Sequence, residues 1–318
     1  MNTRSALLLV LKIIVLTILL FACWSAAALV VGLADSSQPA SQAGVMTAML
    51  SMCALHAVVI SYPIVRSRWS GWQLVLTILV VYYGVVTFLS QIETVVFLNY
   101  LVDIVPAEMV PKFFVHGLVT AAVFAPLAVL VHGRIRGTAE TRESNPRLVM
   151  PWTQWLWKVL VVAVVYVVIY FAFGSLVFIP LAGEAFEEYY AGLQLPPWML
   201  PFQVLRGMLW IAVALPVIRM MKGAWWEAGL AVALLFSVLM SSALLIPNEY
   251  MPAEIRRAHF VEVLTSNFLF GWIVVLAFHR RHGLRRESSQ AQEAVSDQRS
   301  AISRPLSSTA KTPRTPRN

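Results

Sequence analysis

Residue types that can bind metals or carry protons occur in a strongly hydrophobic segment, residues 258–275 (AHFVEVLTSNFLFGWIVV). In an α-helix each residue turns about 100°, so positions i, i+3, i+4 and i+7 share a face. His259, Glu262 and Ser266 therefore lie on one predicted face, with Asn267 at its edge. An imidazole and a carboxylate at this spacing can bind one metal ion, and the carboxylate can also carry a proton.

Other hydrophobic segments carry polar residues at the same helical spacing. Gln203 and Arg206 share one face, and a guanidinium is a natural partner for an anionic group. Gln91 belongs to a polar stripe near the end of another segment, and Glu93 lies off this stripe but close to the same end. His116 is aligned with a threonine one turn further along a fourth segment.

The elements that must position these residues are predicted to be transmembrane helices. Hydrophobic residues make up 59% of the 318 residues and charged residues only 13%, against roughly 25% charged in a soluble domain. Eight stretches reach the approximately 20 residues needed to cross a bilayer. They run approximately over residues 6–33, 44–65, 71–92, 113–132, 154–180, 199–218, 225–246 and 257–279. We therefore predict an all-α, polytopic membrane protein with eight transmembrane helices.

The distribution of charge predicts the orientation of these helices. Lys and Arg gather in alternate connections, which the positive-inside rule places in the cytoplasm. These connections contain Arg4, Arg66, Arg68, Arg134, Arg136, Arg142, Arg147, Arg219, Lys222, Arg280 and Arg281. Both termini are thus predicted to be cytoplasmic, in a multi-pass protein of the plasma (inner) membrane. The basic residues form no face interleaved with aromatics, so the net charge of +8 does not indicate nucleic-acid binding.

An internal match predicts that the chain is a duplication. Residues 105–137 align without a gap with residues 251–283, and both segments contain Pro-Ala-Glu, 146 residues apart. Pro63, Arg66 and Trp72 match Pro216, Arg219 and Trp225 at a spacing of 153 residues. Each half holds four spans, an even number, so the halves are expected to be parallel repeats about an axis along the membrane normal. The predicted organisation is a first repeat over 1–137, a cytoplasmic linker over 138–150, a second repeat over 151–283 and a disordered cytoplasmic tail over 284–318.

In this topology the polar residues share one depth, in the outer half of the membrane. At about 1.5 Å per residue, His116 and His259 lie about one turn below the outer surface, and Arg206 and Glu262 about two. A charged side chain at the bilayer centre costs about 2.5–3.5 kcal/mol even on the lenient insertion scale, so these groups are expected to face the bundle interior. The predicted outward-facing pocket is lined by Gln91, Glu93, His116, Gln203, Arg206, Glu262 and Asn267.

Three functions are compatible with such a pocket. The favoured one is binding or translocation of a small anionic solute, with Arg206 attracting the anion and no cofactor. The second is a metal-dependent membrane enzyme, in which His259, Glu262 and His116 hold a divalent metal. The third is a non-catalytic scaffold whose polar groups only join helices. The residues alone leave open whether the protein is an enzyme.

Overall fold

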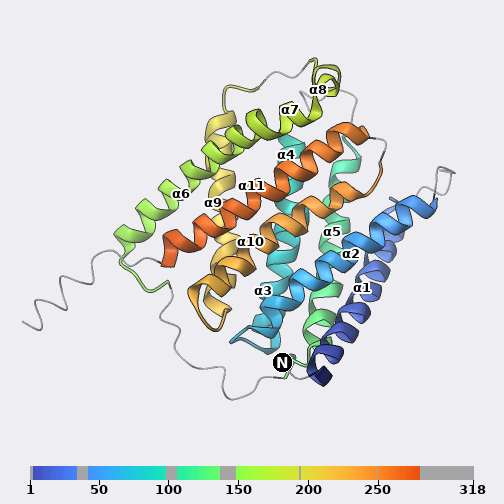
Figure 1. The fold of residues 1–318 in the computed structure, drawn as a ribbon, viewed down its shortest axis with the longest axis vertical. Coiled ribbons are helices and arrows are strands. Elements are labelled where there is room, and N and C mark those ends of the chain that lie inside the picture. The colour runs from blue at the N-terminus through green and yellow to red at the C-terminus, as the bar shows by residue number, and fades with distance from the viewer. Residues whose placement is uncertain are drawn as a thin grey trace, which may run out of the picture. The chain divides into compact units, whose positions relative to one another are not determined.

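A computed structural model describes residues 3–33, 42–97, 106–136, 148–192, 195–248 and 250–279 (Figure 1). Within these residues the secondary structure is helical apart from one isolated β-bridge. The elements are α1 (Thr3–Val31), α2 (Gln42–Val65), α3 (Gly71–Tyr83), η1 (Gly84–Phe88), α4 (Leu89–Phe97), α5 (Met109–Val131), α6 (Trp152–Phe173), η3 (Gly174–Phe178), α7 (Ile179–Ala182), α8 (Glu184–Tyr189), α9 (Met199–Met220), α10 (Trp225–Ser241), η4 (Ser242–Leu245) and α11 (Ala253–His279). Residues 138–147 of the predicted linker and the whole predicted tail, 284–318, lie outside the described residues.

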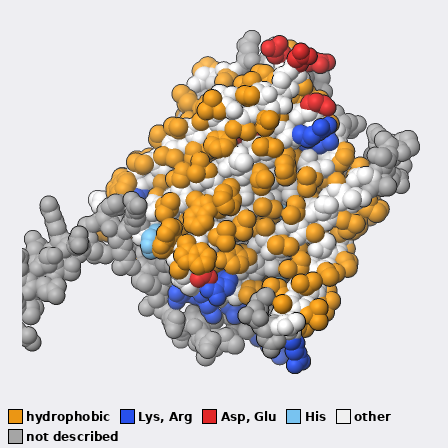
Figure 2. All heavy atoms as spheres, in the orientation of Figure 1, with side chains coloured by type: hydrophobic (Ala, Val, Ile, Leu, Met, Phe, Trp, Pro, Cys, Tyr) orange, Lys and Arg blue, Asp and Glu red, His pale blue; other side chains and the backbone are white. Residues whose placement is uncertain are grey.

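Eight helical spans are long and apolar enough to cross a membrane, which confirms the predicted number. The third span joins α3, η1 and α4, and the fifth joins α6, η3 and α7. Large apolar side chains are exposed along the spans, for example Leu7 at 68% and Val168 at 62%. Figure 2 shows hydrophobic side chains over most of the visible face, as contact with lipid requires. The fold is that of a multi-pass membrane protein.

The third and fifth spans each contain one π-helical turn, η1 and η3, and both turns begin at a glycine. Such a turn inserts an extra residue into the helix, and π-helical turns occur frequently at functional sites. η1 packs closely against its neighbours. A Cβ at Gly84 would lie 3.1 Å from Val213 of α9, and a Cβ at Gly117 of α5 would collide with the Thr87 side chain.

Helices from the two halves of the sequence pack together around one hydrophobic core. In the first half α1 packs against α2 and α5, and α3 packs against α5. In the second half α6 packs against α9 and α11, and α10 packs against α11. Between the halves, α2 contacts α10, while α3, η1 and α4 contact α9 (Figure 1).

The connections after the second and sixth spans pair with each other at one end of the helices. The backbone N–H of Arg68 donates to the Met220 carbonyl (2.7 Å), and that of Lys222 donates to the Arg66 carbonyl (2.8 Å). The Arg66 guanidinium also forms an ion pair with Glu227 at the start of α10. Lys and Arg side chains gather at this end in Figure 2, whereas α8, with Glu184 and Glu187, lies at the other.

Candidate functional site

The guanidinium of Arg206 lies in the protein interior, two turns from the start of α9, and its side chain is only 3% exposed. Nε and Nη2 both donate to the backbone carbonyl of Leu89, at 3.2 and 3.1 Å. Leu89 directly follows η1, where the change from π-helical to α-helical turns alters the backbone hydrogen bonding. The Arg206 guanidinium is therefore bound by main chain of the third span, directly after the π-helical turn.

A carboxylate completes the environment of Arg206. Nη2 of Arg206 lies 2.6 Å from Oε2 of Glu93, which is on α4 and 24% exposed. The hydroxyl of Tyr170, on α6, donates to the other carboxylate oxygen of Glu93 at 2.8 Å. Both oxygens are thus bound, by donors from two different helices. We call Leu89, Glu93, Tyr170 and Arg206 the Arg206 site.

Two amides beside the Arg206 site keep unsatisfied acceptors. Gln203, one turn before Arg206, is fully buried, and its Nε2 contacts only the Met199 sulfur at 3.5 Å. The Oε1 atoms of Gln203 and Gln91 are buried without a hydrogen-bond partner among the described residues. A buried polar atom left unsatisfied costs about 1–3 kcal/mol. Such atoms in a native interior call for a bound partner, either water or a ligand.

The predicted pair on α11 is formed and lies under α8. Nδ1 of His259 is 3.2 Å from Oε2 of Glu262, and Nε2 is 3.0 Å from the Tyr190 hydroxyl. The two ring nitrogens of His259 are thus bound on opposite sides, one by a carboxylate of its own helix and one by a phenol from the connection after α8. Burial raises the pKa of Tyr190, which keeps this phenol protonated. The ring of Phe178, in η3, stacks on His259 with centroids 3.9 Å apart.

The other predicted pocket residues have partners elsewhere. Nε2 of His116 lies 3.0 Å from the Trp24 carbonyl of α1, and the two rings meet edge to face. Within the described residues, no hydrogen bond or ion pair joins His116 to the Arg206 site or to His259. Nδ2 of Asn267 donates to the Met240 sulfur of α10 at 3.4 Å.

The described residues contain no group of three or more His, Cys, Asp or Glu side chains that could hold a metal ion. His259 and Glu262 meet, but the third ligand proposed for them, His116, is bonded to α1. Zinc sites use three or four protein ligands. The arrangement therefore gives the metal interpretation no support.

Several contributors to the site were not predicted. Tyr170 follows Tyr166 by four residues on α6, a spacing that places both on one face and could have been noticed. The Leu89 carbonyl carries no sequence signal, because every residue type supplies a backbone carbonyl. Tyr190 and Phe178 come from the connection around α8, outside the stripes of polar residues.

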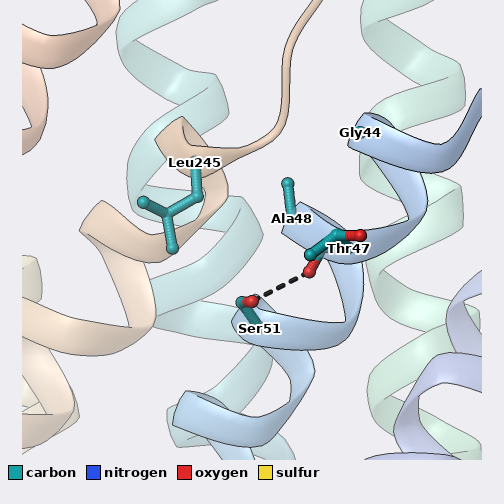
Figure 3. A pocket seen from close by; sticks show the side chains of 5 residues that line it. All are labelled: Gly44, Thr47, Ala48, Ser51 and Leu245. Atoms are coloured by element: carbon teal, nitrogen blue, oxygen red, sulfur yellow. Dashed lines mark hydrogen bonds between the residues drawn. The ribbon is translucent and has the colours of Figure 1, made fainter. Parts of the chain in front are cut away.

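An open recess lies apart from these polar groups. It has a volume of about 630 Å³ between the start of α2 and η4 and is lined by Gly44, Thr47, Ala48, Ser51 and Leu245 (Figure 3). Its one hydrogen bond drawn in Figure 3 runs from the Ser51 hydroxyl to the Thr47 carbonyl, 2.8 Å, within the same helix. The recess thus offers no convergent polar groups, and the Arg206 site remains the best candidate.

No known protein family, no characterised protein and no solved structure matches this chain. The candidate site must therefore be interpreted from its own chemistry.

Proposed function

We propose that this membrane protein binds, and moves across the bilayer, a small anionic solute at the Arg206 site. The observation that carries the proposal is the buried guanidinium of Arg206 on α9, which is bound by Leu89 and Glu93 of α4, while Tyr170 of α6 binds the same Glu93. A buried charge is costly and in membrane proteins usually marks a substrate or ion pathway. A scaffold could join the same helices with neutral side chains, so it does not account for an arginine there.

The proposed location of the site is the outer half of the membrane. Arg206 lies in the part of α9 far from the basic connections, which the positive-inside rule assigns to the cytoplasm. Glu93, the carboxylate of the pair, is 24% exposed and is therefore not sealed inside the bundle. Because the number of spans is even, the start of α1 and the end of α11 then lie on the same side of the membrane, the cytoplasmic side. The proposed membrane is the plasma membrane.

The proposed architecture is a pair of parallel four-helix repeats, 1–137 and 151–283, joined by residues 138–150. Two contacts support it. The paired connections contain Ser67 and Met220, which are equivalent at the repeat spacing of 153 residues, and equivalent segments meet at a two-fold axis. Arg206 of α9 contacts Leu89, and α2, the helix equivalent to α9, contacts Ser242 through His56 at 2.6 Å. Ser242 is the equivalent of Leu89 at the same spacing, whereas His56 is equivalent to Leu209 rather than to Arg206. The Arg206 site would then lie where the two repeats meet, as in other parallel-repeat carriers.

The direct test is ligand binding to the full-length protein in lipid nanodiscs. Acetate, lactate, phosphate and sulfate are compared with the uncharged acetamide and lactamide, using the shift in unfolding temperature. At least one anion should stabilise the wild-type protein saturably, and Arg206→Lys should weaken that effect because lysine lacks the planar fork of donors. If no anion acts, or if Arg206→Lys binds equally well, anion binding at this site is refuted. Stoichiometric zinc or iron in the purified protein would instead favour the metal interpretation.

Orientation can be tested separately with single cysteines on exposed positions. Arg136→Cys, at the basic end, should react with an impermeant maleimide only in inverted vesicles, and Glu187→Cys, in α8, only in right-side-out cells. The opposite labelling pattern would place the Arg206 site in the inner half of the membrane.

A further inference from the structure

The Arg206 site has the geometry of a carboxylate-binding site that already holds a carboxylate. One oxygen of Glu93 receives the guanidinium at 2.6 Å and the other receives the Tyr170 hydroxyl at 2.8 Å. Arginine and a phenol, one on each oxygen, are the donors that a small free carboxylate would require. Glu93 comes from the chain itself, but it occupies the place of a ligand.

We infer that the solute is a small monocarboxylate which replaces Glu93 on Arg206 and Tyr170, and that Glu93 takes up one proton as it leaves. This inference rests on the proposed anion-binding function and names its substrate class. The free site pairs one guanidinium with one carboxylate. A bound anion beside an ionised Glu93 would leave an unpaired negative charge in a medium of low dielectric constant, which is strongly unfavourable. Protonation of Glu93, with the proton taken from water, restores the balance of charge.

The other charged and ionisable groups around Glu93 fit this exchange. Four groups interact electrostatically with Glu93: Arg206 on α9, Tyr166 and Tyr170 on α6, and Tyr190, the residue after α8. Besides α9, α4 packs against α5, whose ionisable residues are Lys112 and His116.

A second carboxylate, Glu262 on α11, interacts electrostatically with Arg206. It is hydrogen-bonded to His259 at 3.2 Å and does not contact Arg206 through a hydrogen bond or ion pair among the described residues. Glu262 is therefore the matched control for Glu93: a carboxylate of the same region that is not held by the donors of the Arg206 site.

A buried amide acceptor close to Arg206 can take part in the exchange. The Oε1 atoms of Gln91 and Gln203 are buried acceptors without partners among the described residues. A protonated carboxyl group gains a donor that an ionised one lacks. Gln203 lies one turn before Arg206 on the same helix, so an acceptor beside the Arg206 site would lower the cost of the exchange.

The first test uses Glu93→Ala in nanodiscs with acetate as the probe. The variant leaves Arg206 and Tyr170 without their carboxylate, and acetate should fill the gap and raise the unfolding temperature saturably, by roughly 5 °C at a large excess over its Kd. Sodium chloride at equal ionic strength and acetamide should have no such effect. Glu262→Ala should show no acetate-specific rise. A rise in Glu262→Ala but not in Glu93→Ala would overturn the inference.

The second test needs no disruptive variant. Propionate is fully ionised between pH 6 and pH 8, so any pH dependence of its binding reports a group on the protein. If Glu93 must gain one proton, the apparent Kd of the wild-type protein rises about tenfold per pH unit, because the protonated form becomes rarer as the pH rises. Glu93→Gln mimics the protonated state and should bind propionate with a flat pH profile, whereas Glu262→Gln should keep the slope.

The outcomes separate the inference from the proposed function. A flat profile in the wild-type protein, or a slope lost in Glu262→Gln and kept in Glu93→Gln, refutes the exchange while anion binding itself stands. Binding of phosphate or sulfate without any carboxylate effect likewise refutes only the substrate class. Failure of every anion in every form of the protein removes the proposed function and the inference together.

Discussion

Replacing Arg206 by methionine tests whether the Arg206 site is one coupled unit. Methionine has a similar length but no charge, so Glu93 keeps only its Tyr170 hydrogen bond at 2.8 Å, and Leu89 loses two contacts at 3.1 and 3.2 Å. Removing one partner of a buried ion pair costs about 3–5 kcal/mol. Glu93 is 24% exposed and water can partly solvate it, so we expect about 3 kcal/mol, at the low end of that range.

The double variant Arg206→Met/Glu93→Gln removes both charges and should recover most of this loss. We expect the pair of substitutions to be less destabilising than Arg206→Met alone, with a coupling of about 2 kcal/mol. The assay is reversible unfolding of the full-length protein in mixed micelles titrated with a denaturing detergent. Arg219→Met is the matched control: Arg219 lies on the same helix but is exposed, and the contacts of an exposed arginine contribute about 0–1 kcal/mol, so its replacement should cost no more than that. Equal losses for Arg206→Met and Arg219→Met, or strict additivity with Glu93→Gln, would refute the coupling.

Further substitutions test single contacts in the same assay. Tyr170→Phe removes only the hydroxyl that donates to Glu93 and should cost about 1 kcal/mol; an unchanged stability would show that this bond is not formed. Gly117→Ala should cost about 1–3 kcal/mol because its Cβ would collide with Thr87, whereas Gly174→Ala, with nothing within 4 Å of its Cβ, should be tolerated. Equal effects of the two glycine substitutions would contradict the close packing of α5 against η1.

The sequence predicts the transmembrane helices well, because the thickness of the bilayer requires long apolar segments and such segments can be recognised directly in the sequence. All eight predicted spans are present, although the fourth span, α5, begins at Met109, four residues before its predicted start at 113. The interior position of Arg206 and Gln203 also follows from physics available in the sequence, since a guanidinium facing lipid is costly. Both side chains are buried.

The partners of these residues were harder to predict. A helix that is apolar on every side does not reveal which face turns toward which neighbour, so the stripe containing His116 could not be assigned to α1 rather than to the centre of the bundle. The acceptor for Arg206 is a backbone carbonyl next to a π-helical turn, and no side-chain pattern encodes it. Glu93 was predicted to line the pocket, but nothing in the sequence paired it with Arg206, which lies on another span.

The backbone pairing between residues 66–68 and 220–222 also constrains how the molecule can change shape. These hydrogen bonds join the connection after α2 to the end of α9, at the opposite end of α9 from Arg206. A junction at one end allows a change of angle with little displacement there and the largest displacement at the far end, as in hinge motion. A tilt of one group of helices about this junction would therefore separate Arg206 from Glu93, while the helix ends at the basic connections would move little.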